Sequence, residues 1–205
     1  MDKIDFRKSL KALYAPKTGQ FTEIIVPPMR YLMIDGIGDP AVSRDYQSAV
    51  EALYSVAYPL KFMSKKELGK DYAVPPLEGL WWADDMHDFV NSRRDRWRWT
   101  MMIMLPDWIS TGMIEKAKSD ASAKKGNPAI AAIRSEMLDE GLCMQIMHVG
   151  SYAEEAPVLK VLHEEFMPAK GFTYNGKHHE IYLGDPRRTA PEKLKTVLRQ
   201  PVRKI

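Results

Sequence analysis

The order of strand-like and helix-like segments repeats within the chain, and this repeat limits the folds that it can adopt. Residues 30–36 form a strand-like apolar run that ends in glycine. Asp39 and Pro40 then predict a helix N-cap and the first helical position. One face of the following helix carries five apolar side chains over about five turns, namely Tyr46, Val50, Leu53, Tyr54 and Ala57. Because residues 76–82 and 97–105 predict two further strands, the first half has the order β-α-β-β.

The second half has the same order. Residues 142–150 form another strand-like run that ends in glycine, and residues 154–167 carry apolar side chains at helical spacing. Residues 178–183 and 194–199 predict two more strands. Two small halves joined edge to edge bury far more apolar surface than either half alone. We therefore expect an α+β fold of duplicated β-α-β-β modules that form a joined antiparallel sheet, with helices on one face and a ligand pocket at the seam.

The flanking segment and the linker between the halves complete the expected domain organisation. Residues 1–20 have a weak amphipathic pattern, which we interpret as an N-terminal helical extension. The remaining residues, 21–205, are expected to form one domain. Its parts are a first module at 21–108, a helical connector at 109–140 and a second module at 141–205.

The connector is expected to hold two helices. The first covers residues 109–125 and ends at Gly126. The second begins with Asn127 as its cap and Pro128 at its first position, and it ends at Gly141.

Patterning excludes several classes of protein. The longest apolar runs, such as residues 100–105, are far too short to cross a bilayer. Residues 1–5 include acidic side chains and no apolar segment of the kind that a secretory signal needs. Cys143 is the only cysteine, which excludes an intramolecular disulfide and agrees with a reducing compartment. We therefore expect a cytoplasmic protein that has no membrane partner.

The charge pattern does not favour a nucleic-acid partner. The net charge is only +3, and the basic residues gather in two segments, 93–98 and 187–204. No helix-turn-helix pattern, RNP-like strand or glycine-rich phosphate loop accompanies them, so we interpret them as solvated surface. His178 and His179 are adjacent, which does not suit a shared metal ion, and no cofactor motif is present. We expect no direct nucleic-acid partner, no metal and no cofactor.

Motifs in the second half resemble a known family. Residues 148–152 (HVGSY), residues 179–182 (HEIY) and the segment 196–201 are similar to the GyrI-like ligand-binding domain. That family includes effector domains of multidrug-responsive regulators and a gyrase-inhibitory protein. Its fold, two β-α-β-β modules related by a pseudo-twofold axis, is what the resemblance implies for this chain.

Three further stretches resemble a free-standing branch of the family. They are residues 26–29 (VPPM), residues 76–82 (PLEGLWW) and residues 184–196 (GDPRRTAPEKLKT). Some members of this branch are hydrolases that open the cyclopropane of duocarmycin-type natural products. The resemblance therefore implies a small-molecule-binding protein that hydrolyses electrophilic planar compounds, as a detoxifying activity.

The resemblance also implies a site. Glu180 matches the family glutamate at the base of the ligand pocket, and the duplication places Glu78 on the equivalent strand. Since side chains alternate along a strand, Trp82 shares a face with Glu78, and Tyr182 shares a face with Glu180. A carboxylate beside aromatic rings suits planar or cationic lipophilic small molecules. His148 belongs to the motif at 148–152 and is expected to contact the ligand.

The same groups could catalyse hydrolysis. Glu180 would act as general base on the attacking water. The hydroxyl of Tyr152 or Tyr72 would donate to the oxygen that gains charge as the ring opens, and we assign Tyr152 the catalytic role. Trp82 and Trp99 would stack on a planar substrate.

Simpler interpretations of these residues stay open. Glu180 could be a solvated strand carboxylate, Trp99 could be packing, and one of Trp81 and Trp82 is expected to be ordinary core. At the level of function, the alternatives are a non-catalytic multidrug-binding or effector-sensing protein and a protein-binding gyrase inhibitor. A homodimer is one option for the oligomeric state.

Overall fold

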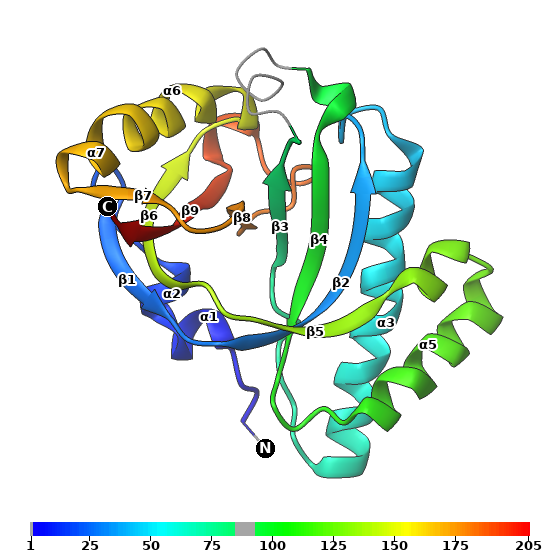
Figure 1. Ribbon diagram of the computed structural model, residues 1–205. Coiled ribbons are helices and arrows are strands. Elements are labelled where there is room, and N and C mark those ends of the chain that lie inside the picture. The colour runs from blue at the N-terminus through cyan, green and yellow to red at the C-terminus, as the bar shows by residue number, and fades with distance from the viewer. Residues whose placement is uncertain (1, 85–92) are drawn as a thin grey trace. The chain divides into compact units, whose positions relative to one another are not determined.

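The computed structural model describes residues 2–84 and 93–205, which form two compact units (Figure 1). The first unit holds residues 1–9 and 29–138, and the second holds residues 10–28 and 139–205. Residues 85–92 lie outside the described residues, and the short 3₁₀ turn η1 (Arg94–Arg96) follows them.

The first unit is an antiparallel sheet with two long helices. Its strands are β2 (Met29–Ile37), β3 (Leu77–Trp82), β4 (Arg98–Leu105) and β5 (Arg134–Leu138), in the order β3-β4-β2-β5. The helices are α3 (Arg44–Leu68) and α5 (Thr111–Lys125), and a short helix α1 (Phe6–Ser9) precedes them. Figure 1 shows α3 beside this sheet and α5 beside α3. The predicted order β-α-β-β is confirmed here.

Helix α3 begins later and ends later than the sequence predicts. Its N-cap is Ser43, whose Oγ accepts the backbone N–H of Tyr46 at 3.1 Å, so the cap expected at Asp39 is wrong. The helix has 25 residues and ends at Gly69, which adopts the left-handed conformation (φ 65°) that a C-cap favours. Ser64 lies inside the helix and is fully buried, because its hydroxyl accepts the indole N–H of Trp108 at 2.9 Å.

The connector contains one of the two predicted helices. Helix α5 ends at Gly126, as expected, but the helix expected to begin at Asn127 is wrong. Asn127 caps only the 3₁₀ turn η2 (Pro128–Ala132), and the chain then forms β5. Pairing with β2 supplies the backbone hydrogen bonds of this segment, so the tertiary partner overrides the helical spacing of its apolar residues.

The second unit is also an antiparallel sheet with helices. Its strands are β1 (Thr22–Val26), β6 (Gly141–Val149), β8 (His178–Tyr182) and β9 (Lys195–Lys204), in the order β1-β6-β9-β8, and β7 (Phe172–Tyr174) also pairs with β9. The predicted helix at 154–167 is present as a series of turns. They are η3 (Tyr152–Glu154), α6 (Glu155–Lys160), the π-helical η4 (Val161–Phe166) and α7 (Met167–Ala169). Two short pieces complete the unit, α2 (Lys11–Tyr14) and the 3₁₀ turn η5 (Pro191–Lys193).

The strand registers confirm the duplication. On β3, Leu80 faces Thr100 of β4, and on β8 Tyr182 faces Thr196 of β9. Two residues back along each strand, Glu78 and Glu180 therefore occupy equivalent positions. The register thus supports an α+β fold built from two β-α-β-β modules, as the sequence predicts.

Each module also has an extra strand that the sequence analysis did not identify as a strand. Strand β1 lies at the start of the first module in the sequence but pairs with β6 of the second unit. Strand β5 precedes the second module but pairs with β2 of the first unit. Each unit therefore depends on a segment that lies in the other module, or next to it, in the sequence.

Each unit has buried apolar side chains. In the first unit, the buried side chains of α3 face those of β2 and β4, with Leu32, Leu53 and Met101 fully buried. In the second unit, Met144, Leu162, Met167, Phe172 and Val202 form one cluster. No helix in the described part of the chain combines the length and the apolar character that a bilayer crossing requires.

Candidate functional site

Strand β8 presents its polar side chains to two opposite faces. His178, Glu180 and Tyr182 point to one face, because side chains alternate along a strand. His179 points to the other face and is fully buried. This alternation separates a group around Glu180 from a buried network around His179.

The carboxylate of Glu180 is contacted on both oxygens by its neighbours on β8. The Tyr182 hydroxyl donates to Oε2 at 2.8 Å, and Nε2 of His178 lies 3.3 Å from Oε1 without the alignment of a hydrogen bond. The Glu180 side chain is 14% exposed. No lysine or arginine of the described residues pairs with it, so its negative charge lacks such a partner.

Two tyrosine rings stand beside this carboxylate. The rings of Tyr152 and Tyr182 meet edge to face, with centroids 5.7 Å apart and an interplanar angle of 75°. Burial, together with the negative charges of Glu155, Glu180 and Asp185, raises the pKa of Tyr152 to about 12. Tyr152 therefore keeps its proton at neutral pH and can donate a hydrogen bond. It is also 40% exposed, so a ligand can reach it from solvent.

A second carboxyl group, Glu155, belongs to the same cluster. It begins α6, three residues after Tyr152, and is only 5% exposed. Burial and, to a smaller extent, the charge of Glu180 raise its pKa to about 9, and the Thr196 hydroxyl opposes the shift. Glu155 is therefore protonated at neutral pH. Sequence analysis missed this residue because an acidic side chain in the first turn of a helix is typical of a solvated one.

Two imidazoles, the buried His178 and the half-buried His163, continue the cluster away from Glu180. The rings of His178 and His163 have centroids 6.3 Å apart, and the nitrogens of His178 and Nε2 of His163 lack hydrogen-bond partners among the described residues. Burial and the neighbouring His178 lower the pKa of His163 to about 4, so His163 is neutral at pH 7. His163 lies on the π-helical η4, an irregular geometry that is frequent at functional sites.

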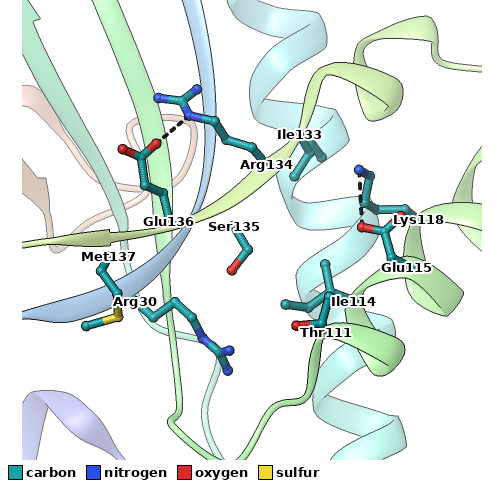
Figure 2. A pocket seen from close by; sticks show the side chains of 10 residues that line it. All are labelled: Arg30, Thr111, Ile114, Glu115, Lys118, Ile133, Arg134, Ser135, Glu136 and Met137. Carbon is teal, nitrogen blue, oxygen red and sulfur yellow. Dashed lines mark hydrogen bonds and ion pairs between the residues drawn. The ribbon is translucent and has the colours of Figure 1, made fainter.

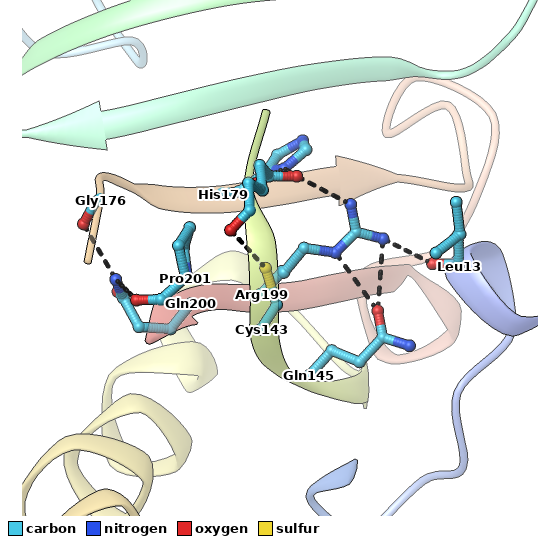
Figure 3. A network of polar contacts seen from close by, with 9 residues as sticks. Leu13, Cys143, Gln145, Gly176, His179, Arg199, Gln200 and Pro201 are labelled. Atoms are coloured by element: carbon cyan, nitrogen blue, oxygen red, sulfur yellow. Dashed lines mark hydrogen bonds and ion pairs between the residues drawn. The ribbon is translucent and has the colours of Figure 1, made fainter. Parts of the chain in front are cut away.

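A buried ionic network lies on the opposite face of β8 (Figure 3). Nδ1 of His179 lies 3.0 Å from both oxygens of Glu140, and Arg199 donates to Glu140 Oε2 at 3.2 Å. Arg199 also donates to the carbonyl of Leu13 at 2.8 Å and to Gln145 at 3.3 Å. Burial opposes ionisation of Glu140, but His179 and Arg199 lower its pKa to about 2. The network joins α2, β6, β8 and β9 of the second unit.

His148, a predicted ligand contact, contacts the turn that follows β6. It is 7% exposed, and its Nε2 lies 3.1 Å from the carbonyl oxygen of Ser151. Ser151 in turn donates twice to Oε2 of Glu154, both times at 2.8 Å, which completes a capping box. These contacts fix the turn that carries Tyr152.

The first unit holds the other predicted ligand residues. Trp99 is 1% exposed and packs edge to face on Tyr46, and its indole N–H has no hydrogen-bond partner among the described residues. Glu78 and Trp82 lie on β3 and are buried and half-buried respectively. Tyr72 lies in a different aromatic cluster, with Phe6 and Trp108. The structure therefore does not bring Tyr72 together with Trp99.

A surface hollow of the first unit involves none of the predicted site residues (Figure 2). It has a volume of about 410 Å³ and lies between β5 and α5. Lys118 pairs with Glu115, Arg134 pairs with Glu136, and Arg30 donates to the backbone carbonyl of Ile109. Because these cationic side chains already have partners and none of the predicted site residues lines the hollow, we do not take it as the ligand site.

The cluster around Glu180 can bind and polarise a small molecule. It offers one carboxylate without a lysine or arginine partner, one protonated carboxyl, a phenol and aromatic edges. Among the residues that the structure describes, no group of three or more potential metal ligands is found.

Comparison with known proteins identifies the family. The profile of the GyrI-like small molecule binding domain matches residues 20–203, almost the whole chain. The chain belongs to this family. It is therefore a GyrI-like small-molecule-binding domain, as the motifs at 148–152 and 179–182 predict.

Solved structures of GyrI-like size and fold agree with this assignment. An uncharacterised conserved protein from Listeria innocua is 43% identical, with a TM-score of 0.87, over 98% of this chain and 100% of that chain. A hydrolase from Listeria innocua is 41% identical, with a TM-score of 0.84 over the same shares. The EcmrR C-terminal domain shares the fold at 11% identity, with a TM-score of 0.57 over 91% of this chain and 98% of that chain. No protein with a curated description matches the chain.

Sequence reasoning found part of the GyrI-like cluster. Of its predicted members, the structure brings Glu180, Tyr182 and Tyr152 together. It adds Glu155 and His178, which the sequence analysis did not assign to a site. The alternation along β8 could have indicated His178, since it shares a face with Glu180.

Proposed function

We propose that this GyrI-like domain binds planar or cationic lipophilic small molecules at Glu180 and hydrolyses those that carry an electrophilic cyclopropane. The observation that carries the proposal is the state of Glu180. Its side chain is largely buried and is contacted by Tyr182 and His178 of the same strand. It has no lysine or arginine partner among the described residues. A carboxylate in such surroundings is stabilised by an organic cation or can take a proton from water.

Binding would use the carboxylate and the tyrosine rings together. An organic cation near Glu180 restores the charge balance that burial removes. The faces of Tyr152 and Tyr182 add cation–π or stacking contacts, each worth about 0.5–2 kcal/mol. Tyr152 is partly exposed and gives a ligand its first contact.

Hydrolysis would use Glu180 as the general base. The water oxygen bonds to the cyclopropane CH₂ carbon while the strained C–C bond breaks, and the electron pair passes through the ring system to the dienone oxygen. Glu180 takes the proton of the water, and the Tyr152 hydroxyl donates a hydrogen bond to the oxygen that gains charge. The product phenolate then takes a proton from solvent and becomes the phenol, and Glu180 returns its proton to solvent. Tyr152 suits this role because its high pKa keeps it protonated.

The hydrolase from Listeria innocua supports a catalytic role. It is 41% identical to this chain, and the match covers 98% of this chain and 100% of the hydrolase. Such identity over the whole fold supports the proposal that this chain is also a hydrolase. That its substrate is a cyclopropane-bearing compound is our own proposal. Detoxification of planar alkylating compounds is the biological role that this reaction would serve.

The test is turnover of a cyclopropane-bearing duocarmycin-type compound, followed by absorbance and mass. Wild-type protein should form a water-added product catalytically, and Glu180→Gln should lower kcat by at least about 100-fold, in the range expected for a lost general base. Glu165→Gln, an exposed carboxylate of the same unit, is the matched control and should keep full activity. Saturable binding without product would make the domain a binding protein without this activity. Full turnover by Glu180→Gln would overturn the role of the base.

A further inference from the structure

The mechanism above leaves Glu155 unused, although its surroundings are unusual for an acidic side chain. It is more than nine-tenths buried, and its Oε1 has no hydrogen-bond partner among the described residues. It lies one helical turn after Tyr152, whose ring packs on Tyr182, the residue that holds Glu180. Glu155 is therefore a second acid beside the proposed ligand position.

The groups that act on Glu155 come from three elements. Glu180 on β8 contributes a negative charge, Tyr152 on η3 contributes a neutral phenol, and Thr196 on β9 contributes a hydroxyl. No lysine or arginine of the described residues forms an ion pair with Glu155. None of these groups would stabilise a negative charge on Glu155 by an opposite charge. A positively charged ligand would supply that stabilisation and would therefore favour ionisation of Glu155.

We propose that Glu155 releases its proton when a lipophilic organic cation binds beside Glu180, so that cations bind more tightly as the pH rises and neutral ligands do not. The inference rests on the proposed function only in placing the ligand at Glu180, and it does not require hydrolysis. It makes Glu155 the residue that distinguishes charged from uncharged ligands.

The direction of the effect follows from the protonation states. Without ligand, burial and the charge of Glu180 hold the pKa of Glu155 at about 9. An opposite charge within about 4–6 Å lowers the pKa of a carboxyl by roughly 1–3. Between the lowered value and about 9, binding a cation therefore expels a proton. Over this window Tyr152 stays protonated, with a pKa of about 12, and His163 stays neutral, with a pKa of about 4.

A matched pair of probes separates charge from shape. Methyltriphenylphosphonium carries a permanent positive charge that does not titrate, and triphenylphosphine oxide is a neutral molecule of nearly the same shape. Each is titrated into the full chain by calorimetry, in buffers with different ionisation enthalpies, at several values between about pH 6.5 and pH 9. The dependence of the heat on the buffer gives the number of protons released.

The cation should release up to about one proton near pH 7.5 and bind on the order of tenfold more tightly at the alkaline end than at the acidic end. The oxide should release none and show a flat affinity. Glu155→Gln, which mimics the protonated acid, should abolish both the release and the pH dependence for the cation. Glu165→Gln should behave as wild type. Thermal unfolding checks that Glu155→Gln is folded. The comparison of the two probes on the wild-type protein tests the proposal even if this variant does not fold.

Three results would overturn the proposal. They are cation binding without proton release across the whole range, unchanged release by folded Glu155→Gln, and binding of the oxide without binding of the cation. The last result would leave the proposed small-molecule site intact. If neither probe bound, the binding site at Glu180 would fail together with this proposal, whereas turnover of the cyclopropane compound tests the hydrolysis separately.

Discussion

The hydroxyl of Tyr182 donates a 2.8 Å hydrogen bond to Oε2 of Glu180, two residues away on the same face of β8. A strand brings such neighbours together without any loop, so the contact is set by local geometry. Because the acceptor is a carboxylate, this bond is charge-assisted and stronger than one between neutral groups. It fixes the direction of the oxygen that we propose as the base.

Tyr182→Phe should therefore weaken the proposed site while leaving the protein folded. Hydrogen bonds to charged groups are worth about 1.5–3 kcal/mol, so we expect kcat/KM for the cyclopropane substrate to fall by roughly 10- to 100-fold. Steady-state kinetics measures the change, and thermal unfolding checks the fold. Tyr58→Phe removes a hydroxyl from a half-exposed ring of α3 and should have no effect. Unchanged kinetics in Tyr182→Phe would show that this bond does not hold the base.

The buried network on the other face of β8 should matter for stability. Glu140→Gln removes the ionised carboxylate that His179 and Arg199 contact, and breaking such a buried pair costs about 3–5 kcal/mol. Urea unfolding near neutral pH should show this loss, whereas the exposed neighbour Asp139→Asn should stay within about 0.5 kcal/mol of wild type.

The same variant gives a pH test. The folded pKa of Glu140, about 2, lies below its ordinary value of 4.5, so its contribution is present above pH 4.5 and is lost as the pH falls through about 2. The difference between wild type and Glu140→Gln should therefore shrink in acid. A difference that stayed constant below pH 4.5 would contradict the ionised state of Glu140.

The sequence predicts the strands of this fold better than its helix ends and its edge strands. Residues 30–36, 76–82, 97–105 and 178–183 all form strands close to their predicted bounds, because their apolar patterns agree with their burial. β5 was predicted as helix, since its strand character comes from pairing with β2, which spacing along the chain does not encode. β1 was missed for the same reason, because its partner is β6, more than a hundred residues away.

The candidate site likewise has residues that the sequence predicts and residues that it does not. Glu180 could be predicted because its flanking residues match a family motif and strand alternation sets its face. Glu155 and Glu140 could not, because a carboxyl in the first turn of a helix or before a glycine is typical of solvent-exposed positions. Their burial depends on which strands pack against them, and sequence pattern alone does not give that.

A side chain at Gly36 should destabilise the protein, because the ring of Trp99 occupies the space where a Cβ atom would lie. A Cβ atom added at Gly36 would lie 2.1 Å from the Trp99 ring, which is itself fully buried. Overpacking of this kind costs about 1–3 kcal/mol, so Gly36→Ala should lower the free energy of unfolding by that amount. In a double-mutant cycle, Trp99→Leu should remove most of the cost of Gly36→Ala. Additive effects of the two changes would contradict the clash.

Gly112 is the matched control for that experiment. It lies in the first turn of α5, where an added Cβ would meet no atom closer than 3.9 Å. Because alanine stabilises a helix relative to glycine, Gly112→Ala should raise the free energy of unfolding by up to about 0.5–1 kcal/mol. Glycine to alanine should thus lower the free energy of unfolding at position 36 and raise it at position 112.

The protonated state of Glu155 should be visible in stability without any ligand. Its folded pKa, about 9, lies above the ordinary value of 4.5, so the folded protein binds the proton more tightly than the unfolded chain does. The resulting stabilisation is complete below pH 4.5 and is lost as the pH rises through about 9. Glu155→Gln removes this dependence, because an amide does not titrate. The stability of wild type minus that of the variant should fall by up to about 1.4 kcal/mol per pH unit, measured by urea unfolding between about pH 5 and pH 8. A flat difference over that range would mean that Glu155 is already ionised in the folded protein, and the proton that we propose a cation to release would not be there.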